Sequence, residues 1–169
     1  MVHSCKFDSV IMAVEIERKF LITSDAFKQA SYKKNYIKQG FLNSDKNRVV
    51  RVRITDEKAF LTIKGASNKN GTSRYEWEKE ISTTEATELL LLCEEGIIEK
   101  YRYLVKIGTH IFEIDDFLGD NNGLVIAEVE LTSENETYTK PTWLGDEVTG
   151  ITKYYNSNLS KHPFCKWND

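Results

Sequence analysis

The stretch VEIERKFLI, residues 14–22, decides the fold because charged side chains recur in it at every second position. Successive side chains of a β-strand point to opposite faces, so Glu15, Glu17 and Lys19 share one face. Two neighbouring carboxylates repel each other unless a cation lies between them. A lysine beside two such carboxylates therefore indicates a site that holds a metal and an anion together.

The same period of two predicts about eight strands in all. The seven further stretches are residues 35–42, 48–54, 59–64, 73–81, 100–107, 111–117 and 124–131. Short connections at 56–58, 68–72 and 108–110 predict antiparallel neighbours. Ser82 and Glu85 form a capping box that begins one clear helix, with Gly96 as its expected stop. Weaker helices are expected near 24–31, 133–139 and 152–161, and the fold class is α+β with a large antiparallel sheet.

The bulk composition indicates one domain over residues 12–169, with residues 1–11 as a disordered extension. The net charge is −3 over 169 residues, which gives no general attraction to nucleic acid. No apolar run approaches the roughly 20 residues of a membrane span, so no membrane association is expected. Three scattered cysteines, Cys5, Cys93 and Cys165, lack zinc spacing and cannot all pair, which favours a cytoplasmic protein.

The charges on the polar faces are segregated by strand rather than mixed as on an ordinary solvated surface. The cations are Lys19, Arg51, Arg53, Lys64, Arg74, Lys100, Arg102 and Lys153, and the anions are Glu15, Glu17, Glu76, Glu78, Glu113, Asp115, Glu128 and Glu130. The opposite faces are apolar enough to pack under helices. About eight strands can close into a barrel that holds one small ligand, which would place the charged faces inside.

Buried charges are costly unless they are paired or bound to a ligand. Clustered carboxylates suit a hard divalent cation such as Mg²⁺ or Mn²⁺, and clustered arginine and lysine suit phosphoryl oxygens. A metal–polyphosphate complex requires both. No nucleophilic Ser/His or Cys/His arrangement and no Gly-rich P-loop occurs in the sequence, so catalysis would depend on metal-activated water and electrostatic stabilisation.

At these residues the chain resembles the CYTH domains, or triphosphate tunnel metalloenzymes. Residues 15–19 match the ExExK signature on the first strand, and RVR (51–53), LTIK (61–64), RYEWE (74–78), KYR (100–102), FEIDDF (112–117) and AEVEL (127–131) follow in the family's order. The resemblance covers about residues 14–160 and implies a closed antiparallel eight-stranded β-barrel. The inorganic triphosphatase branch is the most similar in appearance.

The resemblance also implies roles for individual residues. The divalent metal would be bound by Glu15, Glu17, Glu113, Asp115, Glu128 and Glu130, and the triphosphate by Lys19, Arg51, Arg53, Lys64, Arg74, Lys100, Arg102 and Lys153. Lys19, Lys100, Glu128 and Glu130 would act in catalysis. The C-terminal segment 148–156 keeps the spacing of the family's pattern, with Lys153 where the family often has arginine and Ile151 where aspartate is common. Lysine lacks the bidentate geometry of arginine.

The expected function is divalent-metal-dependent hydrolysis of inorganic tripolyphosphate or a related small triphosphate, with a homodimer as one assembly. Alternatives within the fold are a class IV-type adenylate cyclase and a thiamine triphosphatase. A nucleobase pocket would need aromatic side chains at the mouth of the barrel, for which Tyr36, Phe41 and Trp143 are the candidates. A polyphosphate- or nucleotide-binding module and a surface-charged structural barrel are the non-enzymatic alternatives.

Overall fold

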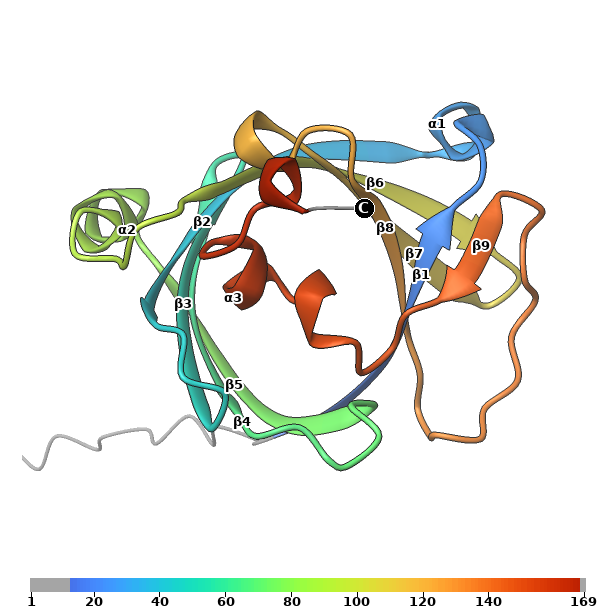
Figure 1. Ribbon diagram of the computed structural model, residues 1–169, viewed down its shortest axis with the longest axis horizontal. Coiled ribbons are helices and arrows are strands. Elements are labelled where there is room, and N and C mark those ends of the chain that lie inside the picture. Colours follow the sequence, from blue (N-terminus) through green and yellow to red (C-terminus); the bar gives the residue numbers. More distant parts are fainter. Residues whose placement is uncertain (1–12, 168–169) are drawn as a thin grey trace, which may run out of the picture.

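The computed structural model describes residues 13–167, so the extension expected at residues 1–11 lies outside the described residues. Eight antiparallel strands form a closed barrel in the order β5-β4-β3-β2-β6-β7-β8-β1, and β1 closes it on β5 (Figure 1). The strands are β1 (Ala13–Ile22), β2 (Lys33–Asn43), β3 (Arg48–Thr55), β4 (Lys58–Gly65), β5 (Ser73–Ile81), β6 (Ile98–Ile107), β7 (His110–Phe117) and β8 (Val125–Glu130). All eight stretches predicted as strands are confirmed as strands of one sheet.

Strand β1 uses one of its edges for β8 and divides the other among three partners. Residues Ala13–Ile16 pair with β5, and from Phe20 the same edge pairs with a ninth strand, β9 (Leu144–Glu147), that the sequence did not predict. Between them the Glu17 amide donates to the Thr72 carbonyl at 3.0 Å. The barrel wall beside Lys19 is therefore completed by loops rather than by a continuous strand pair.

The first two helices lie outside the barrel wall (Figure 1), and they agree only partly with the sequence predictions. Helix α1 (Ala26–Ala30) falls inside the stretch 24–31, and α2 (Thr83–Leu90) begins with the predicted capping box but ends before Gly96. The helix predicted near 133–139 is wrong: these residues form turns and extended loop. The Glu136 carboxylate accepts from the Thr132 amide and hydroxyl there, and such local side-chain bonds compete with a helix.

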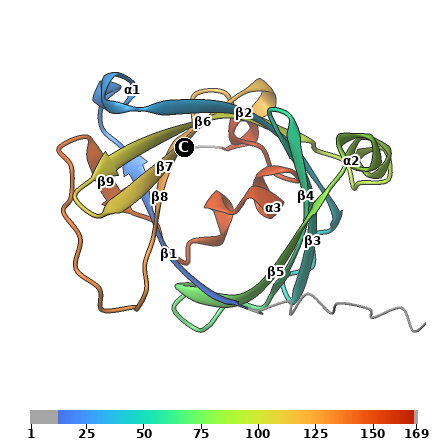
Figure 2. The ribbon, with the colours of Figure 1, turned by 180° about the vertical axis from the view of Figure 1, so that it is seen from behind.

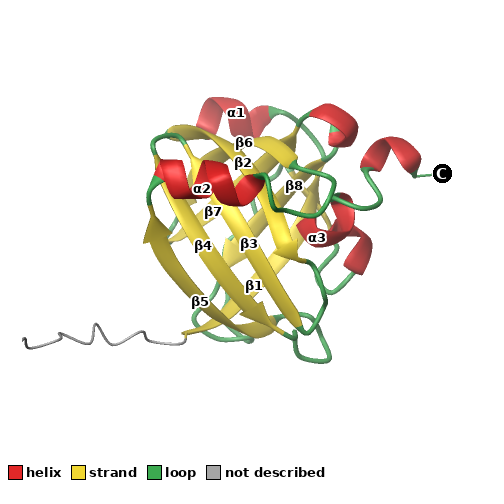
Figure 3. Ribbon diagram, turned by 90° about the vertical axis from the view of Figure 1, so that its left-hand side faces the viewer, coloured by secondary structure: helices red, strands yellow, loops and turns green. Residues whose placement is uncertain are grey.

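The predicted tail helix over 152–161 is also broken into shorter pieces. Helix α3 spans Asn156–Leu159, and 3₁₀ turns occupy Thr152–Tyr154 and Phe164–Lys166, with a third 3₁₀ turn earlier at Gly119–Asn121. The C-terminal segment crosses one opening of the barrel (Figure 1), and the view from behind shows it through the other opening (Figure 2). In the side view α3 and the C-terminal turns gather at one end of the barrel (Figure 3).

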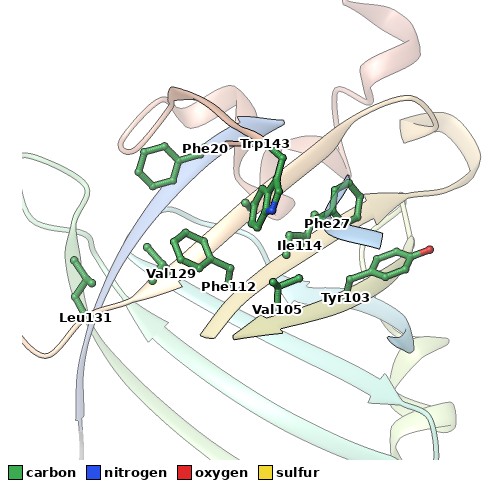
Figure 4. Packing of buried hydrophobic residues seen from close by; sticks show 10 residues of the cluster. Phe20, Phe27, Tyr103, Val105, Phe112, Ile114, Val129, Leu131 and Trp143 are labelled. Carbon is green, nitrogen blue, oxygen red and sulfur yellow. The ribbon is translucent and has the colours of Figure 1, made fainter. Parts of the chain in front are cut away.

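Apolar side chains on the outer face of the barrel form two cores. The larger contains Phe20, Phe27, Phe112, Val129 and Trp143 (Figure 4), with Trp143 edge-on to Phe112 at a centroid distance of 5.7 Å. The smaller lies under α2. The expectation that the outer face supplies a hydrophobic core is therefore confirmed.

A third core lies inside the barrel, where the sequence predicted charges. Ile126 pairs with Asp115 and Phe117 pairs with Lys100, so these apolar residues share the inner face with the charged ones. They pack with Tyr154, Leu159 and other residues of the C-terminal segment. The prediction of an almost wholly charged inner face is wrong at this end, because the C-terminal segment needs an apolar surface to dock on. The barrel interior is thus closed at one end by apolar packing.

Candidate active site

A cavity of about 700 Å³ occupies the rest of the barrel interior. Seven lysines and arginines (Lys19, Arg51, Arg53, Lys64, Arg74, Lys100 and Arg102) and eight glutamates (Glu15, Glu17, Glu76, Glu78, Glu113, Glu128, Glu130 and Glu136) line it. These residues come from seven of the eight barrel strands and one loop. The alternation read from the sequence brings distant motifs into one enclosed space because seven strands turn charged side chains inward.

The acidic side of the cavity is formed by β1, β7 and β8. Glu17 lies directly opposite Glu130 in the strand ladder, and Glu113 lies opposite Glu128. Like charges directly opposite each other destabilise a sheet. This wall therefore favours the binding of a cation.

Lys19, on the same strand as Glu15 and Glu17, is one of the cations that contact this acidic wall. Its ammonium contacts the Glu128 carboxylate and lies 3.0 Å from Glu17 Oε1. Burial alone would lower the pKa of Lys19, but Glu128 and Glu17 together raise it. Burial likewise opposes ionisation of Glu128, yet Lys19 and Arg102 hold its pKa well below the usual range. Both groups are therefore charged at neutral pH.

Lys100, Arg102 and Asp115 form the most buried ion-pair cluster. Lys100 and Asp115 side chains are 2% and 1% exposed, and Lys100 Nζ donates to Asp115 Oδ2 at 2.6 Å. Arg102 binds the same carboxylate in a bidentate manner, with Nε and Nη2 each 2.7 Å from an oxygen. Burial lowers the pKa of Lys100 to about 8, against the opposing effect of Asp115. Asp115 is fully engaged with these cations.

Lys64 and Arg74 form a second ion-pair cluster with carboxylates from β1 and β5. Lys64 Nζ lies 2.8 Å from Glu15 and 2.6 Å from Glu76. Arg74 Nε donates to Glu15 at 3.0 Å, and its Nη2 donates to Glu17 at 3.3 Å. Glu15 is therefore shared by two cations. An anion that attracted Lys64 and Arg74 would free its oxygens for a metal.

The wall formed by β3 is richer in donors than in acceptors. Arg51 and Arg53 share one carboxylate, Glu78, at 3.4 and 3.1 Å. Among the described residues, the buried Nε atoms of both arginines have no hydrogen-bond partner. Burial and the neighbouring Arg51 lower the pKa of Arg53 to about 10. These unused donors favour a bound oxyanion, which would supply the missing acceptors.

Glu130 differs from the other carboxylates of the predicted metal set. Within residues 13–167 it has no lysine or arginine at ion-pair distance, and partial burial with repulsion from Glu15 and Glu113 raises its pKa. No three carboxylate, imidazole or thiol groups converge as a ready metal site in this part of the chain. An unpaired carboxylate opposite Glu17 nevertheless fits a hard divalent cation, whose preferred ligands are oxygen atoms.

The structure places all the predicted site residues around the cavity except Asp115, which is buried behind Lys100 and Arg102, and Lys153. That lysine is exposed and lies over the rings of Tyr154 and Trp167, with its Nζ 4.5 Å from the Trp167 ring centroid, outside the charged cavity. Lys153 lies in the C-terminal segment, and the spacing of residues in that segment did not show which of them face the barrel interior. Its prediction as a triphosphate ligand is therefore not supported by its position.

The three aromatic residues considered for a nucleobase pocket do not surround the mouth of the cavity. The Tyr36 hydroxyl contacts Glu99, and Trp143 lies in the outer core. Phe41 pairs with Arg51 and is 4% exposed, next to the C-terminal segment. The structure therefore assigns each of them a packing position.

Several lining residues were missed by sequence reasoning. Asn156, on α3, accepts from Lys100 Nζ through its Oδ1 at 3.0 Å and lines the cavity. His110 and Glu136, 2.8 Å apart, stand at the mouth with Thr132. Asn156 is the last residue of the C-terminal segment 148–156 that matches the family's pattern, so the sequence could have pointed to it. Glu136 lies on a loop and His110 is the first residue of β7, so no alternating pattern marks either of them.

The charged barrel has relatives among known proteins. The CYTH domain family model matches residues 13–163. The chain belongs to the CYTH domain family. A relative from Acetivibrio thermocellus, named inorganic triphosphatase, is 48% identical over 159 residues, which is 94% of this chain and 100% of that protein. A Nitrosomonas europaea relative of the same name is 33% identical over 150 residues, covering 86% and 96%.

Solved structures support the same family and fold. A crystal structure of an inorganic triphosphatase matches with a TM-score of 0.59 at 30% identity, covering 88% of this chain and 95% of that chain. The resemblance to CYTH domains seen in the sequence is thus confirmed, as is the closed eight-stranded barrel. Among the described residues no helix is both long and apolar enough to cross a membrane.

Proposed function

We propose that this CYTH protein is a divalent-metal-dependent triphosphatase that hydrolyses inorganic tripolyphosphate to phosphate and pyrophosphate. The observation that carries the proposal is an enclosed cavity lined by seven cationic and eight anionic side chains in nearly equal balance. The names of the two curated relatives, both inorganic triphosphatases, support it.

The balance of charges in the cavity supports a metal–triphosphate complex rather than a bare anion. Eight glutamates against seven lysines and arginines give these fifteen side chains a formal net charge of −1. Such a lining does not attract a polyanion by its overall field. A complex with a divalent cation satisfies both sets of side chains, because the carboxylates bind the metal and the cations bind the phosphoryl oxygens.

The metal would be held by Glu15, Glu17, Glu128 and Glu130, with Glu113 holding its waters or completing its coordination. Asp115, which is buried behind the cavity lining and bound to Lys100 and Arg102, would instead position those two cations. Mg²⁺ and Mn²⁺ both suit such oxygen ligands. When bound, the metal supplies a polarising charge and lowers the pKa of a water molecule. Glu17 and Glu130 face each other across the ladder, so they are the two carboxylates best placed to share one cation.

The chain's cations would position the substrate and stabilise charge as it develops. Arg51 and Arg53 offer their unused Nε donors to phosphoryl oxygens. Lys19 and Lys100 would approach the reacting phosphoryl group, since each holds a buried ammonium between the carboxylate wall and the cavity. Lys64, Arg74 and Arg102 would bind the remaining oxygens. Substrate binding would then weaken the ion pairs that these cations make with the glutamates.

Incubation with tripolyphosphate and with ATP, each with Mg²⁺ or Mn²⁺ in turn, tests the proposal. The expected products from tripolyphosphate are phosphate and pyrophosphate in equal amounts, with a chelator abolishing both. Pyrophosphate with 3′,5′-cyclic AMP as the main products from ATP would establish a cyclase instead. Preferred hydrolysis of thiamine triphosphate would establish a thiamine triphosphatase, and tight binding without products would establish a binding module.

The remaining features of the proposed enzyme follow from the same reasoning. We expect a cytoplasmic enzyme that acts on a small molecule, without nucleic acid or membrane as partner. Both a single chain and a homodimer fit this function, and sedimentation of the purified protein measures which of the two forms.

A further inference from the structure

Strand β5 leaves part of one edge without a neighbouring strand in the described part of the chain. On that edge β1 pairs only with Ser73–Glu76, where Ala13 lies opposite Glu76. The other edge of β5 pairs with β4 as far as Ile81. Within residues 13–167, the β1-side edge of Trp77–Ile81 therefore has no strand beside it. We call it the open edge.

The hydrogen-bond pattern shows which backbone groups point toward the open edge. The Glu17 amide donates to the Thr72 carbonyl at 3.0 Å, and the register of β1 on β5 puts these two residues opposite each other. Hydrogen-bonded and non-hydrogen-bonded pairs alternate along an antiparallel ladder. Counting in steps of two from Thr72 reaches Glu78 and Glu80. Their backbone N–H and C=O groups therefore face the open edge, where they form a template for another strand.

The chain that precedes β1 leads directly onto this edge. A strand residue spans about 3.3 Å on either side of a ladder, so five residues before Ala13 suffice to cover Trp77–Ile81. Continuing the register of Ala13 and Glu76 gives the opposing pairs. They are Met12 with Trp77, Ile11 with Glu78, Val10 with Lys79, Ser9 with Glu80 and Asp8 with Ile81.

The side chains of these pairs suit each other. Met12 would pack on the half-buried Trp77, and a thioether beside an aromatic ring is a favourable contact. Asp8 would lie diagonally across from Lys79, at a distance over which opposite charges attract. No pair in this register places two like charges opposite each other. Residues 8–12 therefore match the open edge in length, polarity and charge.

A second copy of the chain suits the open edge less well. Two copies related by a two-fold axis would pair their open edges antiparallel, and the hydrogen-bonding residues of one would face those of the other. With the axis at Lys79, Glu78 of one copy lies opposite Glu80 of the other, and with the axis at Glu78 the two Glu78 residues meet. Like charges directly opposite destabilise a sheet. The segment before β1 is therefore the better occupant.

We propose that residues 8–12 continue β1 along the open edge of β5 and complete the barrel wall there. Two further hydrogen-bonded pairs would form, Ile11 with Glu78 and Ser9 with Glu80. Because Glu78 lines the charged cavity, Ile11 would lie beside it at the rim of that cavity. The proposal replaces the expectation of disorder for these residues, and it holds whether or not the cavity hydrolyses triphosphates.

Amide hydrogen exchange of the full-length protein, followed residue by residue by NMR, is the first test. We expect the amides of Glu78 and Glu80 to exchange at least about 10-fold more slowly than unprotected amides, because each would donate to the added strand. The amides of Trp77 and Lys79 point toward β4 and provide the reference for a bonded amide. Exchange of Glu78 and Glu80 at the rate of unprotected amides would overturn the proposal.

Proline substitutions separate the added strand from simple burial. Ile11→Pro removes the N–H that would donate to the Glu78 carbonyl, whereas Val10→Pro removes an N–H that would point away from β5. Both variants restrict the backbone equally, so Val10→Pro is the matched control. The Glu78 amide should exchange at least about 10-fold faster in Ile11→Pro and at the wild-type rate in Val10→Pro. Equal exchange in the two variants would refute the register.

A disulfide tests the register and the identity of the occupant together. Val10 and Lys79 would form a non-hydrogen-bonded pair with Cα atoms about 4.5 Å apart, within the range that a disulfide spans. Val10→Cys with Lys79→Cys should therefore form a disulfide within one chain on oxidation, identified by peptide mass mapping. Ser9→Cys with Lys79→Cys is the control, because its two side chains would point to opposite faces. Equal yields from both pairs, or a disulfide between two chains, would overturn the proposal.

Discussion

Substitution of Glu130 by glutamine should have opposite effects on stability and on turnover. In the metal-free protein the Glu130 carboxylate is repelled by its neighbours, whereas in the proposed enzyme it binds the metal. Glu130 lies opposite Glu17 in the ladder, and no ion pair to a lysine or arginine compensates it within the described residues. A like-charge pair directly opposite in a sheet costs about 0.2–1 kcal/mol. Glu130→Gln removes one of the two charges while keeping the shape of the side chain, so the metal-free protein should gain about 0.5 kcal/mol.

This gain in stability is large enough to be measured as a change in melting temperature. For a chain of this length, about 0.5 kcal/mol corresponds to a rise of about 1–2 °C in melting temperature. The raised pKa of Glu130 fixes the sign of the pH dependence. The folded state holds the proton more tightly than the unfolded state, so Glu130 costs stability at neutral pH and this cost disappears on acidification. The gain from Glu130→Gln should therefore be visible at pH 7–8 and fade at acidic pH.

Turnover should change in the opposite direction. If Glu130 is a metal ligand, its loss should lower turnover of tripolyphosphate by at least about 100-fold, as even residues that only support a metal ligand cost 10- to 100-fold. Mg²⁺ should also stabilise the variant less than the wild-type protein. Glu80→Gln, at an exposed glutamate paired with Lys58, is the control and should change neither property. A Glu130→Gln protein that melts lower or keeps full turnover would refute the reasoning.

Three further predictions concern the scaffold. Trp143→Ala should lower the free energy of unfolding by about 3–5 kcal/mol, measured by urea denaturation, since it empties the outer core; a loss below about 1 kcal/mol would contradict that packing. Ser82→Ala should cost about 1 kcal/mol in the same assay through loss of the capping box, and an unchanged midpoint would show that the cap contributes nothing. Thr132 lowers the pKa of Glu136 to about 2, so Glu136 stabilises the fold above about pH 4.5 and this contribution is lost as the pH falls toward 2. Glu136→Gln should therefore flatten the acid limb of the stability profile relative to wild type, and superimposable acid limbs would argue against the turn at Thr132.

The strands were predictable because their signal is local. Each strand, such as Arg48–Thr55, carries its own alternation of charged and apolar residues, and the alternation also fixes which residues face inward. The inward placement of Lys19 and Arg102 followed from the same logic. The charged constellation could therefore be read from the sequence without knowing the register.

The features that were missed depend on tertiary contacts. Strand β9, Leu144–Glu147, has no alternating pattern and forms because the edge of β1 beyond Phe20 needs a partner. Lys153 carries the expected charge in the expected frame, yet docking of the C-terminal segment directs Asn156 rather than Lys153 to the cavity. The apolar inner surface at Phe117 looked like any other strand position. No sequence period indicates which end of a barrel a distant segment closes.

The most direct test of the account is a crystal structure with Mn²⁺ and a non-hydrolysable triphosphate analogue that has a free terminal phosphoryl group. The account predicts an anomalous manganese peak at the acidic wall within bonding distance of Glu17 or Glu130, and phosphoryl oxygens within hydrogen-bond distance of Arg51 and Arg53. Manganese or triphosphate bound outside the barrel, with the ion pairs of Lys19 and Lys64 unchanged, would contradict the claim that this cavity is the site of triphosphate chemistry.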